Sequence, residues 1–178
     1  GYKLHMSITV NIKPNNTFEA RECIILVLVA GLSKTITINQ QANEPGIYWV
    51  TKMGTLNTLL NQTQKDTISK MVIKGEINKA DFDVLKKQMP KLIHLDIKEV
   101  KCENDEIPYE AFGNRDIVSN LTLQKIIFPE SITKIGDYAF SGCFGLKDSI
   151  ILPSSITYIG EYAFSSCRGL TGTLILPH

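Results

Sequence analysis

Apolar residues recur in the C-terminal half of the chain at a fixed interval of 24 residues. Residues 126–149, IIFPESITKIGDYAFSGCFGLKDS, are followed at once by a near copy at residues 150–173, IILPSSITYIGEYAFSSCRGLTGT. A third copy begins at Leu174. Self-similarity at such a period is the signature of a solenoid, in which each coil buries its apolar face against its neighbours.

A shorter motif of inward-facing apolar residues extends the array toward the N-terminus. Its forms are Ile68-xx-Met71-x-Ile73, Leu92-xx-Leu95-x-Ile97, Leu123-xx-Ile126-x-Phe128, Leu146-xxx-Ile150-x-Leu152 and Leu170-xxx-Leu174-x-Leu176. Their last positions are 24, 31, 24 and 24 residues apart, which predicts five coils with one insertion. The polar stretches 98–106 and 114–120 are expected to form widened loops on the outside of the coil.

Two segments ahead of the regular copies have helical patterns. Thr55 is placed to cap residues 56–60, and Asn78 precedes Phe82, Leu85 and Met89 at helical spacing. Terminal repeats are atypical because one face has no neighbour, so residues 55–90 are predicted to cap the solenoid. At the other end the sequence stops inside a coil, and we expect the natural protein to continue there.

Residues 6–41 alternate between apolar and polar positions as β-strands do. Runs at 6–12, 23–30 and 35–38 favour three strands, which would make half of a β-sandwich. Pro45 and Gly46 then interrupt the pattern and favour a linker. The sequence therefore predicts a partial Ig-like β module at 1–42, a linker at 43–54 and the solenoid at 55–178, an α+β fold that is mainly β.

The composition is that of an ordinary globular protein. With 43% hydrophobic and 21% charged residues, the chain can bury a real core. Its 19 basic and 18 acidic residues contain no basic block, which argues against nucleic acid as a partner. The most apolar run, residues 23–30, is far shorter than the roughly 20 residues needed to cross a bilayer.

No pattern in the chain indicates a reaction centre. The four cysteines and three histidines lack the spacing of a redox or zinc motif, so we predict no cofactor, no metal and no enzymatic activity. Cys143 and Cys167 lie one period apart and are expected to be free and inward-facing. Phe140 and Phe164 share another slot and are expected to be buried and equivalent, with a cost of about 3 to 5 kcal/mol for Phe164→Ala.

The repeat phrase I-x-x-I-G-x-x-A-F-x-x-C-x-x-L, followed by an apolar strand and proline, resembles the BspA-like leucine-rich repeat family of bacterial surface proteins. It stands at 132–146 and 156–170, and residues 107–112 (IPYEAF) form a partial copy. The resemblance implies a right-handed solenoid with a parallel sheet on one face. It also implies export to the cell envelope, often through a lipid anchor, and roles in adhesion or in binding host proteins or glycans.

The stretch at 30–40, AGLSKTITINQ, resembles the last strands of the BACON domain, an Ig-like sandwich common in proteins of gut anaerobes. If the resemblance holds, the upstream half of that sandwich lies outside this sequence.

In a parallel strand, the residues between the inward-facing ones point outward. This predicts two ladders on the sheet face, formed by Lys125, Ile127, Ser149, Ile151, Thr173 and Ile175. The ladders would either bind a ligand or only shield the sheet from water. Tyr138 and Tyr162 also recur at the repeat period, and they would either offer a platform for sugar or protein or cover the convex turn.

The sequence thus favours a cell-surface binding or adhesion protein that recognises a host protein or glycan through the leucine-rich repeat face. Two alternatives remain open. One is a structural spacer that displays another domain at the cell surface, and the other is an enzyme whose catalytic module lies outside this sequence. A binding face should carry a patch of changing polarity, whereas a spacer should be uniformly polar.

Overall fold

The computed structural model describes residues 21–29, 32–40, 46–115 and 122–172, with side chains described from residue 46 onward. The chain divides into two compact units, Gly1–Asn43 and Glu44–His178.

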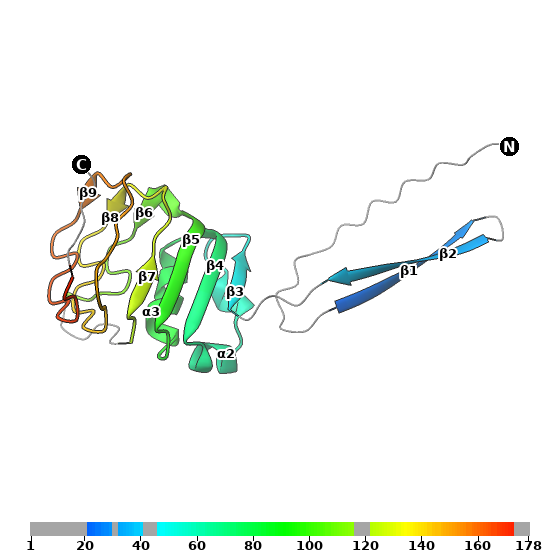
Figure 1. Ribbon diagram of the computed structural model, residues 1–178, viewed down its shortest axis with the longest axis horizontal. Helices are drawn as coiled ribbons and strands as arrows, with labels where there is room; N and C mark the ends of the chain where they lie inside the picture. The colour runs from blue at the N-terminus through cyan, green and yellow to red at the C-terminus, as the bar shows by residue number, and fades with distance from the viewer. Residues whose placement is uncertain (1–20, 30–31, 41–45, 116–121, 173–178) are drawn as a thin grey trace. The chain divides into compact units, whose positions relative to one another are not determined.

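The first unit contains a pair of long antiparallel strands (Figure 1). Strands β1 (Arg21–Val29) and β2 (Leu32–Gln40) pair along their full length, from Arg21 opposite Gln40 to Val29 opposite Leu32. They match two of the three predicted runs, and the third, residues 6–12, lies outside the described residues. Two strands do not make a sandwich, so the Ig-like module stays a prediction.

Four parallel strands form the large sheet of the second unit, in the order β3-β4-β5-β7 (Figure 1). They are β3 (Ile47–Val50), β4 (Lys70–Ile77), β5 (His94–Cys102) and β7 (Lys125–Ile127). The apolar motif predicted their inward faces, since Met71, Ile73, Leu95 and Ile97 are buried. Parallel strands joined by long connections are the arrangement expected of a solenoid.

The first strand of the large sheet lies inside the stretch predicted to be a linker. β3 pairs with β4 from Ile47 opposite Val72 to Val50 opposite Gly75, and both Tyr48 and Val50 are buried. Gly75 permits this approach, because a Cβ there would lie 2.2 Å from the Val50 carbonyl oxygen. Residues 47–50 therefore belong to the solenoid, and the linker prediction is wrong for them. Four residues of alternating burial suffice for an edge strand once a neighbour covers one face.

The sequence predicts outer loops in the widened interval between coils. The structure contradicts this prediction for part of the interval. β5 runs on through residues 98–102, and a 3₁₀ turn, η1 (Glu103–Asp105), leads directly into β6. β5 also carries one residue more than β4 between the pairs Val72–Asp96 and Lys74–Glu99, which is a bulge. The strand continues because Val100 and Cys102 extend its buried face. Residues 116–121 lie outside the described part.

Three helices pack in the first coils of the solenoid. They are α1 (Leu56–Leu59), α2 (Gln62–Thr67) and α3 (Lys79–Gln88). The prediction for α3 is confirmed, since the Asn78 side chain accepts a hydrogen bond from the Ala80 N–H and Phe82, Leu85 and Met89 are buried. The sequence did not predict α2, although Asn61 and Gln64 form a capping box at its start.

The predicted cap of α1 is wrong. The Thr55 hydroxyl donates to the Lys52 carbonyl oxygen at 2.6 Å and makes no capping bond. The buried Asp81 carboxylate of α3 takes this place, accepting from the Leu56 N–H at 2.9 Å and the Gly54 N–H at 2.6 Å. A long-range partner thus replaces the local one.

A small parallel sheet closes the later coils on a second side, in the order β6-β8-β9 (Figure 1). Its strands are β6 (Glu106–Ile107), β8 (Lys134–Ile135) and β9 (Tyr158–Ile159). Just beyond them, the Gly136 N–H donates to the Ile107 carbonyl oxygen at 2.8 Å, and the Gly160 N–H donates to the Ile135 carbonyl oxygen at 2.7 Å. Each regular coil is therefore hydrogen-bonded to the previous one.

Phenylalanine rings form a ladder through the core of the later coils. The Phe112 and Phe140 rings stack at 5.5 Å between centroids, and the Phe140 and Phe164 rings stack at 5.2 Å. Phe82 of α3 meets the first of them edge-on at 5.8 Å. The predicted equivalence of Phe140 and Phe164 is confirmed. Phe140 is buried, whereas Phe164 is half-buried and packs against the edge of the core.

The two repeat-related cysteines are free, as predicted. Cys143 is buried, whereas Cys167 is half-buried and donates from its thiol to the Phe140 carbonyl oxygen at 3.1 Å. Burial raises the pKa of both thiols, to about 11 for Cys167. Neither cysteine is therefore a thiolate near neutral pH.

Candidate binding surface

The outward face of the large sheet is organised in rows that cross the strands. In one row, Lys70, His94 and Lys125 are register partners on β4, β5 and β7. In the next row, Ile47, Val72, Asp96 and Ile127 are partners across β3, β4, β5 and β7. A basic row thus runs beside a mainly apolar one, and we call these two rows the outward face.

The predicted ladder residues that the structure describes do point outward. Lys125 and Ser149 are exposed, Ile127 is 39% exposed and Ile151 is 72% exposed. Thr173 and Ile175 lie outside the described residues. Ile127 and Ile151 are large apolar side chains at equivalent positions of successive coils, so they continue the apolar row beyond β7. Single exposed apolar residues are ordinary, whereas neighbouring ones on one face form an apolar patch.

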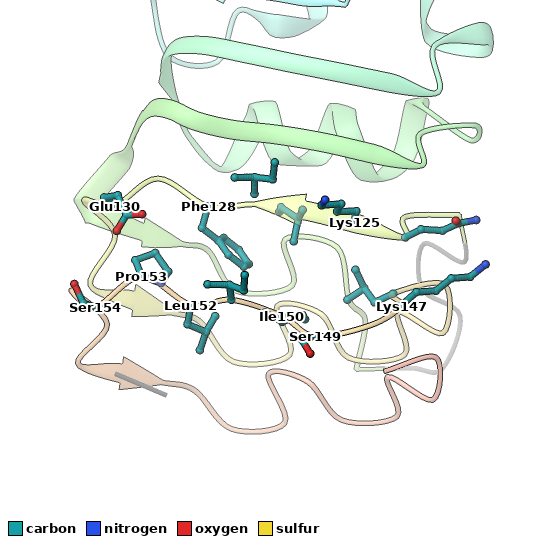
Figure 2. Close-up of a pocket in the computed structure, with 14 residues that line it drawn as sticks. Lys125, Phe128, Glu130, Lys147, Ser149, Ile150, Leu152, Pro153 and Ser154 are labelled. Atoms are coloured by element: carbon teal, nitrogen blue, oxygen red, sulfur yellow. The ribbon is translucent and has the colours of Figure 1, made fainter. Parts of the chain in front are cut away.

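A groove of about 410 Å³ opens between β7 and the chain segment one coil later (Figure 2). In the described residues, β7 is the last strand of the large sheet, and only Ile151 of the following segment carries an isolated β-bridge. The walls come from residues 124–128 and from residues 146, 147 and 149–154, with Glu130 at one end. Phe128, Ile150 and Leu152 form an apolar floor between the two segments.

The charged groups of the groove are separated along its length. Figure 2 shows Lys125 and Lys147 toward one end, with Glu130 and Ser154 at the opposite end. Both lysines and Glu130 are exposed. The groove therefore has a cationic end and an anionic end, joined by apolar walls.

A second hollow of about 200 Å³ adjoins the groove on the outward face. Its lining includes Lys70, Val72, His94 and Asp96, and Lys125 and Ile127 line both depressions. Both rows of the outward face thus lead into the groove. Sequence reasoning missed the members on β4, although the alternation that places Met71 and Ile73 inward would have placed Val72 outward.

A third row of the sheet is already occupied by internal contacts. Lys74 lies 5.5 Å from the centre of the Trp49 ring, and its ammonium is 2.9 Å from a Glu99 carboxylate oxygen. Trp49 is partly exposed beside this pair. The cation there is engaged, and beyond it Glu76 and Lys101 form an exposed pair of register partners, so the two rows beside the groove are the ones that combine apolar and basic side chains.

The tyrosines predicted as a possible platform line neither depression. Tyr138 and Tyr162 stack at 5.2 Å between ring centres, on turns where both have positive φ angles of 55° and 54°. Tyr138 is half-buried and Tyr162 is 61% exposed. Tyr109 approaches the first of them edge-on at 6.3 Å. The rings follow the coil turns, and their role in binding stays a prediction.

Within the described residues, no group of three or more His, Cys, Asp or Glu side chains could hold a metal ion. None of the helices described in the second unit is long and apolar enough to span a membrane.

One known protein family matches the part of the sequence that forms the regular coils. The family model described as "BspA type Leucine rich repeat region (6 copies)" matches residues 105–177. No curated protein matches the chain. Repeats of this type are typical of surface or secreted bacterial proteins and are non-catalytic interaction modules as a rule. The match and the parallel coils together support a leucine-rich repeat solenoid of the BspA type for this part of the chain.

Proposed function

We propose that this chain is a cell-surface binding module that attaches to a host extracellular protein or glycan through the outward face of the large sheet. The observation that carries the proposal is the mainly apolar row of Ile47, Val72, Ile127 and Ile151, which Asp96 interrupts, beside the basic row of Lys70 and Lys125. Apolar side chains interspersed with charged ones on one accessible face are typical of interaction sites. A uniformly polar face would instead favour a spacer.

The dimensions of the face limit its affinity. The four strands and the segment of Ile151, at about 4.8 Å apart, span about 20 Å, and two rows take up about four residues of a strand, or about 13 Å, so the face covers on the order of 300 Å². A standard protein interface buries about 800 Å² per partner. We therefore expect weak binding by this chain alone, in the micromolar range or above, with additional coils or several copies adding avidity.

The test is an array of immobilised extracellular-matrix proteins and glycans, probed with the chain and with two variants of the face. Lys70→Glu reverses an exposed charge, and Val72→Asp places a charge in the apolar row. Both should lower the signal at least tenfold on any spot that the chain binds. The matched comparison is Tyr162→Ser, because loss of signal there would assign binding to the tyrosine turns.

A chain that binds no spot, even when displayed in several copies, would favour the spacer. Circular dichroism of each variant excludes unfolding as the cause of lost binding, and Lys70→Glu serves as the fold-safe variant because its side chain is exposed.

A further inference from the structure

The groove beside β7 has the features of a site for one extended peptide segment. Its floor is apolar, since Phe128, Ile150 and Leu152 are buried there and Ile126 is half-buried. Its volume of about 410 Å³ is in the range of small-ligand sites. An apolar side chain of a ligand can therefore leave water in the middle of the groove.

The ends of the groove select the charge of such a ligand. Lys125 and Lys147 present two ammonium groups toward one end, and no carboxylate lines that end of the described groove. Lys125 and Lys147 have no ion-pair partner among the described residues, unlike Lys74, which is paired with Glu99. A ligand carboxylate would supply the missing counter-charge. At the other end of the groove, Glu130 would repel a second carboxylate of the ligand.

The spacing of these groups sets the length of the ligand. Five residues of chain separate Lys125 from Glu130, so their backbone positions lie at most about 18 Å apart. Because Glu130 lies in the turn that follows β7, the separation is shorter than this limit, and an extended ligand of five residues or fewer covers it. Such a ligand would lie along the edge strand β7, the position at which peptides commonly add to a sheet.

We propose that the groove binds an extended segment of a partner protein that carries an Asp or Glu side chain at the lysine end and an apolar side chain two or three residues away. This rests on the proposed function, because it names the chemistry of the partner for the same surface. The acidic side chain lies between Lys125 and Lys147, and the apolar side chain contacts Phe128 and Leu152.

A positional-scanning library of N-acetylated, C-amidated hexapeptides tests the proposal with the complete chain. We expect selection of Asp or Glu at one position and of an aliphatic or aromatic residue two or three positions away. The best pool should bind at least tenfold more weakly to Lys125→Glu/Lys147→Glu, and that double variant should select Lys or Arg instead. Lys98→Glu, an exposed site on β5 outside the groove, is the matched control and should change neither.

Three results of the peptide experiment would overturn the proposal. They are the absence of any acidic preference, an equal loss with Lys98→Glu, and selection that requires a free C-terminal carboxylate in a parallel library of non-amidated peptides. Self-association that is seen by light scattering and abolished by Lys147→Glu would also overturn it, since the occupant would then be a second copy of this chain.

The array experiment separates this proposal from the function on which it rests. Loss of array binding with Lys70→Glu, together with peptide selection unchanged by Lys147→Glu, would leave the binding surface standing and remove the groove assignment. Array binding that is indifferent to Lys70→Glu and Val72→Asp, with no peptide selected, would remove both.

Discussion

The first coils and the later coils of the solenoid are stabilised in different ways. Residues 47–102 combine long strands with three helices, and they contain all three ion pairs found among the described residues. Residues 105–172 have short strands and no helix in their described part, and each coil stacks the same side chain on the one before. The first region depends on contacts that occur once, and the second on contacts that repeat.

The junction between the two regions is a specific set of contacts. Phe82 of α3 meets Phe112 edge-on, and the Lys86 ammonium donates to the carbonyl oxygens of Glu110 and Gly113. Burial lowers the pKa of Lys86, so the cation there is held by carbonyl dipoles in a partly desolvated place. The helix thus serves as the first element of the phenylalanine ladder, and the repeat array continues from it.

The largest expected effect comes from cutting the ladder in its middle. Phe140→Ala should lower the free energy of unfolding by about 3 to 5 kcal/mol, because the ring is fully buried between two others. Phe164→Ala should cost less, about 2 kcal/mol, since that ring is half-buried. Urea unfolding followed by circular dichroism measures both. Equal costs would show that the Phe164 ring contributes as much to stability as the Phe140 ring despite its greater exposure.

The same variants test whether the two regions unfold together. Trp49 is the single tryptophan of the chain and lies in β3, at the helical end of the solenoid. If the junction couples the regions, Phe140→Ala shifts the urea midpoint of Trp49 fluorescence as much as the midpoint of circular dichroism. A shift in circular dichroism alone would mean that the regions are independent.

The largest effect in the helical region should come from Asp81→Ala. The buried carboxylate accepts from the N–H groups of Gly54, Leu56 and Asn78, and its removal leaves one buried and two partly buried donors without this acceptor. We expect a loss of about 2 to 4 kcal/mol of stability. Asp81→Asn retains one acceptor oxygen and should cost less. Equal losses for the two variants would show that the charge, rather than the hydrogen bonds, matters.

Substitution of Gly136, a glycine that recurs in the repeat, should have an intermediate effect on the free energy of unfolding. A Cβ on Gly136 would lie 2.6 Å from the Tyr109 backbone nitrogen, in the previous coil. Gly136→Ala should therefore force adjacent coils apart and cost about 1 to 3 kcal/mol. Gly54→Ala is the comparison in the helical region, where a Cβ would meet its nearest atom at 3.6 Å but φ is +78°. A larger cost at Gly54 would show that backbone strain outweighs coil spacing.

The repeating region could be predicted from sequence because its contacts repeat. The residue at the Phe140 slot stacks on the equivalent residue one coil away. The period of 24 residues therefore predicts which side chains face inward, which form the outward ladder and where the two free cysteines lie. The half-burial of Phe164 did not follow, because the period predicts which slots are equivalent but not how much surface each ring leaves exposed.

The helical region was harder to predict because its contacts occur once. Local rules found α3 and its Asn78 cap, but the cap of α1 comes from Asp81, 25 residues away from Leu56. β3 was not predicted, because its short run IYWV forms a strand by pairing with the neighbouring β4 and has no strong strand pattern of its own. The groove was not predicted either. The repeat predicts that the ladder continues past β7, whereas β7 is the last strand of the large sheet in the described residues.

The smallest expected effect concerns the ion pairs that distinguish the helical region. On α3, Asp83 accepts from Lys79 at 2.6 Å and from Lys87 at 3.1 Å, each four residues away. Partial burial acts to raise the pKa of Asp83, but the two ammonium groups outweigh it and hold the pKa below its usual value. A lowered native pKa means that the stabilisation is present above pH 4 and is lost as the carboxylate protonates at lower pH.

Asp83→Asn should therefore lower the free energy of unfolding by about 0.5 kcal/mol at pH 7, as expected for partly exposed pairs at this helical spacing. The difference from the parent chain should be smaller at about pH 2 than at pH 7, and it should shrink in 1 M salt at pH 7 because exposed charges are screened. Urea unfolding at the two pH values measures it. A loss that is the same at both values would mean that Asp83 acts through its shape and hydrogen bonding, so that ion pairing would no longer separate the helical region from the repeats.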